Sequence, residues 1–204
     1  MKQNLYSKCN SYDFEKLFKS KGYAWFTKGV YNLNIVGIRS NNQHKVTNDY
    51  DDILVVEYRT GTNLKRAIFN ITTEPGKYYM KNIINCKRTA ILVPDPYRGS
   101  WELGKHKGQY KALVQKKPVK VYRDSNKDEI YDMNPETIDT GNFGINIHRS
   151  GEWVVAKHID KWSAGCQVFA DDNQFRAFIR LCEEQAKIYG NSFTYTLINE
   201  EDMV

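Results

Sequence analysis

The spacing of apolar residues along the chain changes from one period to another. Between residue 31 and about residue 149, apolar and polar side chains alternate, which is typical of strands with one buried face. We expect strands in the segments LNIVGI, DILVVEY, AIFNIT, AILVP, KALVQ, VKVYR and FGINIH, with polar turns between them. A last strand, FTYTLIN, is expected near the end of the chain.

Two segments have helical spacing instead. Phe14, Leu17 and Phe18 share one face of residues 11–23, and Gly22 follows as a stop. A longer helix is expected over residues 172–189, before Gly190. Its apolar face holds Phe175, Phe178, Ile179 and Cys182.

Many short strands without alternating helices indicate a mainly β (α+β) fold, and they favour an antiparallel sandwich or barrel over a parallel sheet. We expect one N-terminal helix and one long C-terminal helix around it. The length of 204 residues suits a single domain over residues 1–204, with residues 1–30 as an N-terminal helical extension.

Composition is that of a soluble globular protein, with 41% hydrophobic and 26% charged residues. No stretch approaches the roughly 18 consecutive apolar residues of a membrane span. The N-terminal sequence MKQNLYSKCNSYDFEKLF has no apolar core of a secretory signal. We therefore expect synthesis in the cytoplasm without a signal peptide, and no membrane span.

The net charge of +6 favours anionic partners, which include a cell wall, a nucleic acid and a membrane surface. Only residues 105–120 are densely basic, and such a run is more often a solvated face than a binding site. The 14 tyrosines come without an RNA-binding signature. A nucleic-acid binder is therefore the weakest of the functions considered, and we expect no nucleic-acid partner.

The four cysteines are Cys9, Cys86, Cys166 and Cys182. They contain no CxxC pair and have no companion histidine pair, so we expect neither a structural metal site nor a cofactor. Four thiols in a chain without a signal fit a reducing cytosol.

One acidic loop, YRDSNKDEIYD, has the oxygen spacing of a calcium loop. The central glycine is missing, so a solvated hairpin turn is the preferred interpretation. The spaced residues are Asp124, Asn126, Asp128 and Asp132.

The strongest chemical signal is the pair His148 and Cys166. A thiolate is the nucleophilic form of cysteine, and an imidazole within hydrogen-bond reach can take the thiol proton. Asn146 and His148 share the less apolar face of the expected strand FGINIH. A catalytic Cys166 is expected to have a pKa well below about 8.5.

Small residues precede the cysteine in WSAGCQVF. They let a substrate carbonyl approach the backbone, and the amides of Gly165 and Cys166 are candidate oxyanion donors beside Ser163. Cysteine is also among the most buried residue types, so Cys166 as a core residue is the alternative. His158 is a rival base in an exposed-looking connector.

At these residues the chain resembles the L,D-transpeptidase catalytic domain family, whose signature is a strand ending in IH followed by SHGC or SxGC. The matching residues are Ile147, His148, Ser163, Gly165 and Cys166. TTEPGKYY is similar to the family's TPxGxY segment, so the resemblance covers at least residues 72–169. YRGSWELGKHKGQYKALVQ and PVKVYRD also resemble uncharacterised phage-encoded wall-lysis proteins.

The resemblance implies that Cys166 is acylated, that His148 is its base, and that the turn before the cysteine supplies oxyanion donors. The chain departs from the family pattern in two ways that bear on this site. Ala164 stands in place of a second histidine, and Arg149 stands in place of a small residue after the base. Gln167 and Val168 also replace the usual pair after the cysteine.

Several residues are candidates for substrate binding in the same cleft. Trp162 and Asn146 flank the cysteine and the histidine in sequence. Arg98, Trp101 and His106 come from a Gly-rich, cationic and aromatic segment that suits a peptide carboxylate. A twisted hairpin with Trp101 packed inside is the structural alternative.

With the Cys–His pair, the resemblance implies a cysteine acyl-transfer enzyme that cleaves or exchanges stem-peptide bonds of peptidoglycan. Hydrolysis by a phage-associated protein is the preferred form of this expectation, and cross-linking by an amine acceptor is the other. The enzyme would act at the bacterial cell wall after release or as part of a virion, with other virion or lysis proteins as further partners. The alternative from another class is a non-catalytic wall-binding or virion structural module with the same fold. Intact His148 and Cys166 favour the enzyme, whereas Arg149 and Ala164 favour the module.

Overall fold

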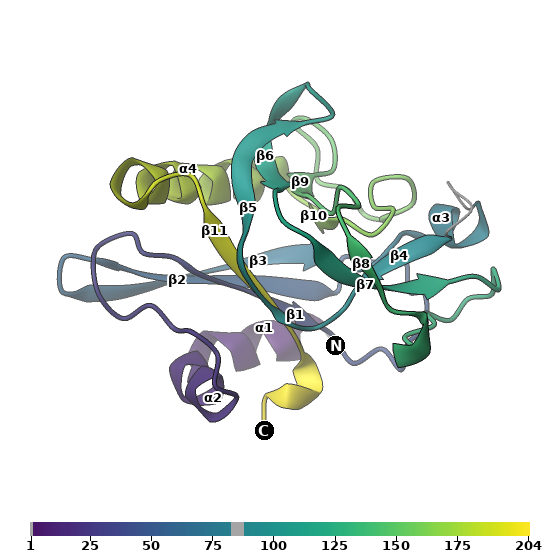
Figure 1. Cartoon of the computed structure of the whole chain (residues 1–204), viewed down its shortest axis with the longest axis horizontal. Coiled ribbons are helices and arrows are strands. Elements are labelled where there is room, and N and C mark those ends of the chain that lie inside the picture. The colour runs from purple at the N-terminus through teal and green to yellow at the C-terminus, as the bar shows by residue number, and fades with distance from the viewer. Residues whose placement is uncertain (1, 83–87) are drawn as a thin grey trace.

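The chain folds around a closed barrel of eight strands, seen in a computed structural model that describes residues 2–82 and 88–204 (Figure 1). In barrel order the strands are β1 (Asn34–Arg39), β11 (Phe193–Asn199), β5 (Pro96–His106), β6 (Tyr110–Gln115), β9 (Ile147–Arg149), β10 (Gln167–Phe169), β3 (Asn63–Thr72) and β2 (Asp52–Thr60). A second, three-stranded sheet holds β4 (Thr89–Leu92), β7 (Val119–Asp124) and β8 (Asp139–Gly141). Cys86 lies outside the described residues.

The mainly β prediction is confirmed, but the expectation of an all-antiparallel arrangement is wrong. The strand pairs β1 with β11 and β9 with β10 run parallel. Each parallel pair needs a crossover connection, because a tight hairpin can only join antiparallel neighbours. Alternation of apolar residues reports which face is buried and not which way the neighbouring strand runs, so the sequence pattern could not reveal these pairs.

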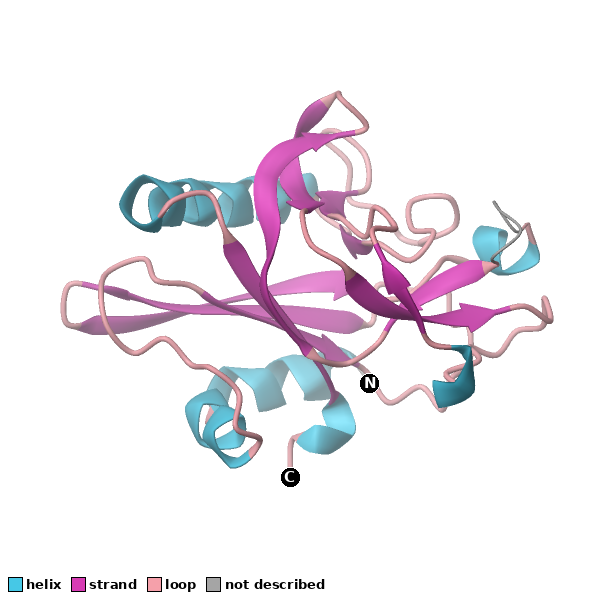
Figure 2. Ribbon diagram, viewed as in Figure 1, coloured by secondary structure: helices cyan, strands magenta, loops and turns pink. Residues whose placement is uncertain are grey.

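Strand β1 lies between two apolar layers and is buried on both faces. All six residues of β1 are buried. Ile35 belongs to the large core cluster, which the barrel strands share with α4 and the small sheet, whereas Val36 and Ile38 pack on the other side with the N-terminal helices. Figure 2 shows the long helix on one side of the strands and the N-terminal helices on the opposite side.

The N-terminal region forms two helices where one was expected. α1 (Lys2–Ser11) is followed after a two-residue break by α2 (Phe14–Ser20). Asp13 causes the break, because its side chain accepts a hydrogen bond from the Lys16 amide at 2.9 Å and caps the new helix. Gly22, with φ +69°, follows α2 as expected of a left-handed stop.

The long C-terminal helix α4 (Asp172–Tyr189) matches its prediction. Asp171 caps its first turn and Gly190, with φ +84°, ends it. Its apolar face joins the large core cluster. The short elements are α3 (Lys77–Lys81) and two 3-10 turns, Pro135–Thr137 and Glu200–Asp202. No helix among the described residues is long and apolar enough to cross a membrane.

Two segments near the site differ from the strand predictions. FGINIH is a strand only from Ile147, because Gly144 adopts φ +73° and interrupts the alternation. The Gly-rich segment around Trp101 is part of β5, an eleven-residue strand, and Trp101 is completely buried there. The alternative of Trp101 packed inside a hairpin of β5 and β6 is therefore confirmed.

In the acidic loop, side-chain oxygens accept hydrogen bonds from backbone amides of the same loop. Asp124 accepts from the Asp132 amide at 2.8 Å, and Asp128 accepts from the Ile130 amide at 2.7 Å. Asn126 accepts from the Asp128 amide at 3.2 Å. This is the bonding of a turn.

A buried tyrosine connects the barrel wall to the strand that follows the cysteine. Gly37 leaves room for it, since a Cβ there would lie 1.8 Å from the Tyr195 hydroxyl. That hydroxyl donates to the Gln167 side-chain oxygen at 2.8 Å, and the Gln167 amide group reaches the Gly165 carbonyl at 3.4 Å. The contact therefore fixes the backbone on both sides of Cys166.

Tyr195→Phe is expected to reduce the free energy of unfolding by about 1 to 3 kcal/mol, because the buried Gln167 oxygen loses its donor. Urea unfolding followed by circular dichroism measures the change. Tyr189→Phe is the matched control: its hydroxyl donates to Val30 at the exposed surface, and we expect a change below about 0.5 kcal/mol. Equal losses in the two variants would contradict the role given to Tyr195.

Candidate active site

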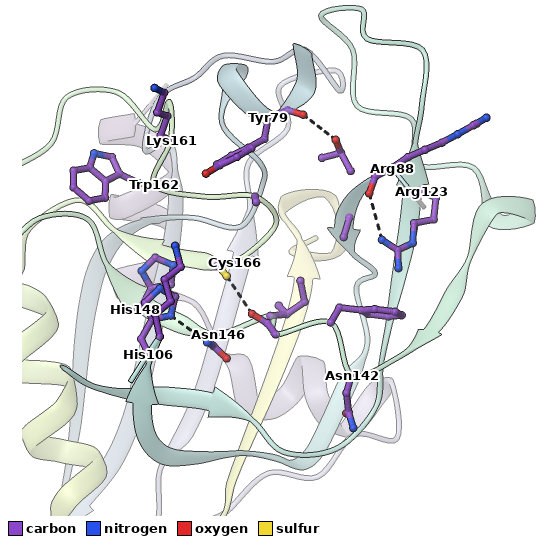
Figure 3. Close-up of a pocket in the computed structure, with 17 residues that line it drawn as sticks. Tyr79, Arg88, His106, Arg123, Asn142, Asn146, His148, Lys161, Trp162 and Cys166 are labelled. Carbon is purple, nitrogen blue, oxygen red and sulfur yellow. Dashed lines mark hydrogen bonds between the residues drawn. The ribbon is translucent and has the colours of Figure 1, made fainter. Parts of the chain in front are cut away.

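The parallel pairing of β9 with β10 brings the histidine and the cysteine to one place. His148 pairs with Val168, and the Gln167 amide donates to the Asn146 carbonyl at 2.9 Å. Cys166 directly precedes β10, and its side chain lines the same cavity as His148. Figure 3 shows the Cys166 sulfur beside His148.

The turn before the cysteine is held by backbone contacts. Gly165 has φ +122°, and a Cβ there would lie 2.3 Å from the Ala90 carbonyl oxygen, so only glycine fits. The Ser163 carbonyl accepts from the Gly76 amide at 2.9 Å. Gly76 in turn lies against the backbone of Asp160, where a Cβ would be 2.2 Å from the carbonyl oxygen.

Ser163 organises the inside of this turn. Its hydroxyl donates to the Cys166 carbonyl at 2.8 Å and accepts from the Gly165 amide at 3.2 Å. The Gly165 amide, one of the two expected oxyanion donors, is therefore already engaged in this state. Ser163 is fully buried, and its role is to shape the turn.

His148 presents a neutral imidazole. Its Nδ1 donates to the Arg149 carbonyl at 2.7 Å, because a carbonyl oxygen can only accept, and the Tyr110 hydroxyl lies 3.3 Å from the same nitrogen. Nε2 then carries the lone pair. Burial, followed by the neighbouring His106, lowers the pKa of His148 to about 3, so the ring remains a base at neutral pH.

Cys166 is half-buried, and its thiol donates to the Gly144 carbonyl at 3.4 Å. Burial raises the pKa of the Cys166 thiol, while the Asn146 amide and the charge of Lys107 act in the opposite direction. The expected depressed pKa is therefore wrong for the resting state. The resting pair is a thiol beside a neutral imidazole.

The pair lines a cavity of about 700 Å³ (Figure 3). The sequence-predicted residues Asn146, Trp162 and His106 line it as well. Sequence reasoning missed four cations and two aromatic rings in its wall. These are Arg88, Lys107, Arg123, Lys161, Tyr79 and Phe143.

The missed cations come from four separate segments of the chain, so no local motif could have grouped them. Lys107 alone carried a signal, as part of the basic run of residues 105–120. Arg123 is paired with Asp139 at 2.9 Å and lies over the Phe143 ring. No acidic residue is among the described residues that line the cavity.

Two residues expected to bind substrate, Arg98 and Trp101, do not line the cavity, and neither does the rival base His158. Arg98 is exposed and does not line the cavity. Trp101 is buried in the core, where its indole donates to the Ile145 carbonyl at 2.8 Å and supports the cavity wall from behind. His158 is exposed and pairs with Asp49 at 3.3 Å, away from the cysteine.

The Arg149 side chain points to the opposite face of β9 from His148. It bonds Asp172 at 2.8 Å and lies over the Tyr110 ring at 4.4 Å. Only its backbone carbonyl contacts the candidate base. The residue thus acts on the site by fixing the tautomer of His148.

Within residues 2–82 and 88–204, no three His, Cys, Asp or Glu side chains are grouped closely enough to hold a metal ion. Comparison of the chain with protein-family models, with curated proteins and with solved structures gives no match.

Alkylation of Cys166 by iodoacetamide is expected to be slow at pH 7 and still rising above about pH 8.5, because burial raises the pKa of the thiol. Labelling followed by peptide mass spectrometry measures Cys166 apart from the other cysteines. A rate that reaches its plateau below pH 7 would show a thiolate in the resting protein and contradict the neutral pair.

Stability is expected to fall as the pH is lowered below about 6.5. Burial and Lys107 lower the pKa of His106 to about 4, and the pKa of His148 is lower still. As the pH falls, these histidines therefore bind protons in the unfolded chain before they do so in the folded chain. In His106→Gln this loss between pH 6.5 and pH 4.5 should shrink by about 2 kcal/mol. Urea unfolding across that range measures it, and identical slopes for both proteins would refute the expectation.

Proposed function

We propose that the protein is a cysteine acyl-transfer enzyme that cleaves peptidoglycan stem peptides, with a barrel of the L,D-transpeptidase type. One observation carries the proposal: the Cys166 thiol and the unprotonated Nε2 of His148 belong to the same cavity. The motif residues that resemble the family are the ones that build this arrangement.

The neutral resting pair defines the first step. His148 Nε2 takes the thiol proton as the sulfur of Cys166 bonds to the substrate carbonyl carbon. The C–N bond of the tetrahedral intermediate then breaks, and His148 returns the proton to the leaving amine. Water attacks the thioester, His148 takes its proton, and that proton returns to sulfur as the C–S bond breaks.

The charges of the cavity support an anionic peptide as substrate. Arg88, Lys107 and Lys161 stand at its wall without an acidic neighbour in the described lining. Stem peptides of bacterial walls carry free carboxylates, which such a wall attracts. The same charges repel the ammonium group of an incoming acceptor strand. Hydrolysis at the cell wall, by a phage-associated protein, is therefore the proposed reaction over cross-linking.

A non-catalytic wall-binding or virion module is the second candidate. Two observations favour it: the raised pKa of the Cys166 thiol, and the Gly165 amide already bonded to Ser163. In that case the cationic cavity would hold stem peptides without cutting them, together with other virion or lysis proteins as partners.

Digestion of purified peptidoglycan from several wall types tests the proposal. The wild type is expected to release new stem-peptide termini, identified by mass, and Cys166→Ala is expected to release none. His148→Gln should lower the rate by about 100-fold to 10,000-fold, since it lacks the general base.

His158→Gln is the matched control, because it removes an exposed histidine outside the cavity, and it should digest like the wild type. If the wild-type protein binds walls but releases no fragment from any of them, the enzyme proposal is wrong and the binding module is supported.

A further inference from the structure

A second histidine is stacked on the candidate base. His106 stands at the end of β5 and is 7% exposed. Its ring centroid lies 4.0 Å from that of His148, with an interplanar angle of 22°. Both rings line the cavity that holds Cys166, and Figure 3 shows them together beside it.

Asn146 fixes which nitrogen of His106 carries the proton. The Asn146 side-chain oxygen accepts from the Gln115 backbone amide at 2.9 Å, so its NH₂ group must face the other way. That NH₂ group lies 3.1 Å from Nδ1 of His106. An amide NH₂ only donates, so Nδ1 of His106 accepts, and the neutral ring bears its hydrogen on Nε2.

The two stacked rings therefore hold opposite tautomers. His148 donates through Nδ1 to the Arg149 carbonyl and keeps a lone pair on Nε2. His106 accepts at Nδ1 and keeps an N–H on Nε2. One ring is prepared to take a proton, and the other is prepared to donate a hydrogen bond.

The site also needs a donor. Of the two candidate backbone donors, the Gly165 amide already donates to Ser163, which leaves the Cys166 amide, and Ala164 has no polar side-chain atom to add. Acyl transfer places negative charge on the former carbonyl oxygen, and a fixed donor in a site shielded from water stabilises that charge.

We propose that His106 is a second catalytic residue, which donates its Nε2 hydrogen to the carbonyl oxygen of the scissile bond as Cys166 attacks. This inference rests on the proposed function. It adds an imidazole on β5 as a donor beside the Cys166 amide, in place of the Gly165 amide that is bonded to Ser163.

Two variants separate a donor from a packing ring. His106→Phe keeps a flat ring without a donor, and its kcat on peptidoglycan should fall by about 100-fold with KM little changed. His106→Gln keeps an N–H group in the region of Nε2, and its kcat should stay within about tenfold of the wild type. His158→Gln again serves as the control. Equal kcat for wild type and a folded His106→Phe would overturn the proposal, as would equal losses in the two variants.

The tautomers can be measured without any turnover. The chain has four histidines, so long-range ¹H–¹⁵N spectra at pH 7 can be assigned by single substitutions. We expect the proton on Nε2 in His106 and on Nδ1 in His148. A proton on Nδ1 of His106 would overturn the proposal even if the protein is an enzyme.

Asn146→Asp provides the inverse test, because a carboxylate only accepts and would pull the His106 proton to Nδ1. This variant should show the exchanged tautomer and a kcat as low as that of His106→Phe. A wild-type kcat with the exchanged tautomer would refute the donor role. If the wild type releases nothing from any wall although both tautomers are as expected, the enzyme assignment itself has failed, and the role of His106 with it.

Discussion

The parallel pairing of β9 with β10 is the constraint on which the candidate site depends. Each strand has only three residues, so the pairing itself supplies few hydrogen bonds. Its position is set by neighbours: Tyr195 holds Gln167, and Gly165 fits against the Ala90 carbonyl. The barrel wall, the small sheet and the turn before Cys166 thus fix the nucleophile together.

Electrostatically the site combines a neutral centre with a positive wall. Burial keeps the Cys166 thiol protonated and keeps both imidazoles neutral at neutral pH. In the proposed mechanism, charge appears at the centre only when a substrate carbonyl is attacked, because the thiol proton moves at that moment. Under the proposed function, the cations that line the cavity attract the carboxylates of the stem peptide.

The elements that could be predicted from the sequence are those determined by the pattern of neighbouring residues. α4 follows from its apolar face and Gly190, and most strands follow from alternation. The parallel pairs, and β5 hidden in a Gly-rich segment, depend on contacts between distant residues. The same holds in the site: His148, Cys166, Asn146 and Trp162 were found through one motif, whereas Arg88 and Lys161 reach the cavity only through the fold.

The two close backbone approaches in the site have a consequence for genetics. Gly76 and Gly165 contribute no reactive atom, yet each leaves room that a single methyl group would fill with a clash against a carbonyl oxygen. A methyl group at either position would shift the turn that carries Cys166, although the sequence would still contain both Cys166 and His148. For the proposed enzyme, a screen for inactive mutants should therefore recover substitutions at these glycines as well as at Cys166 and His148. The glycine variants would lose activity through a steric clash, although no reactive group is removed.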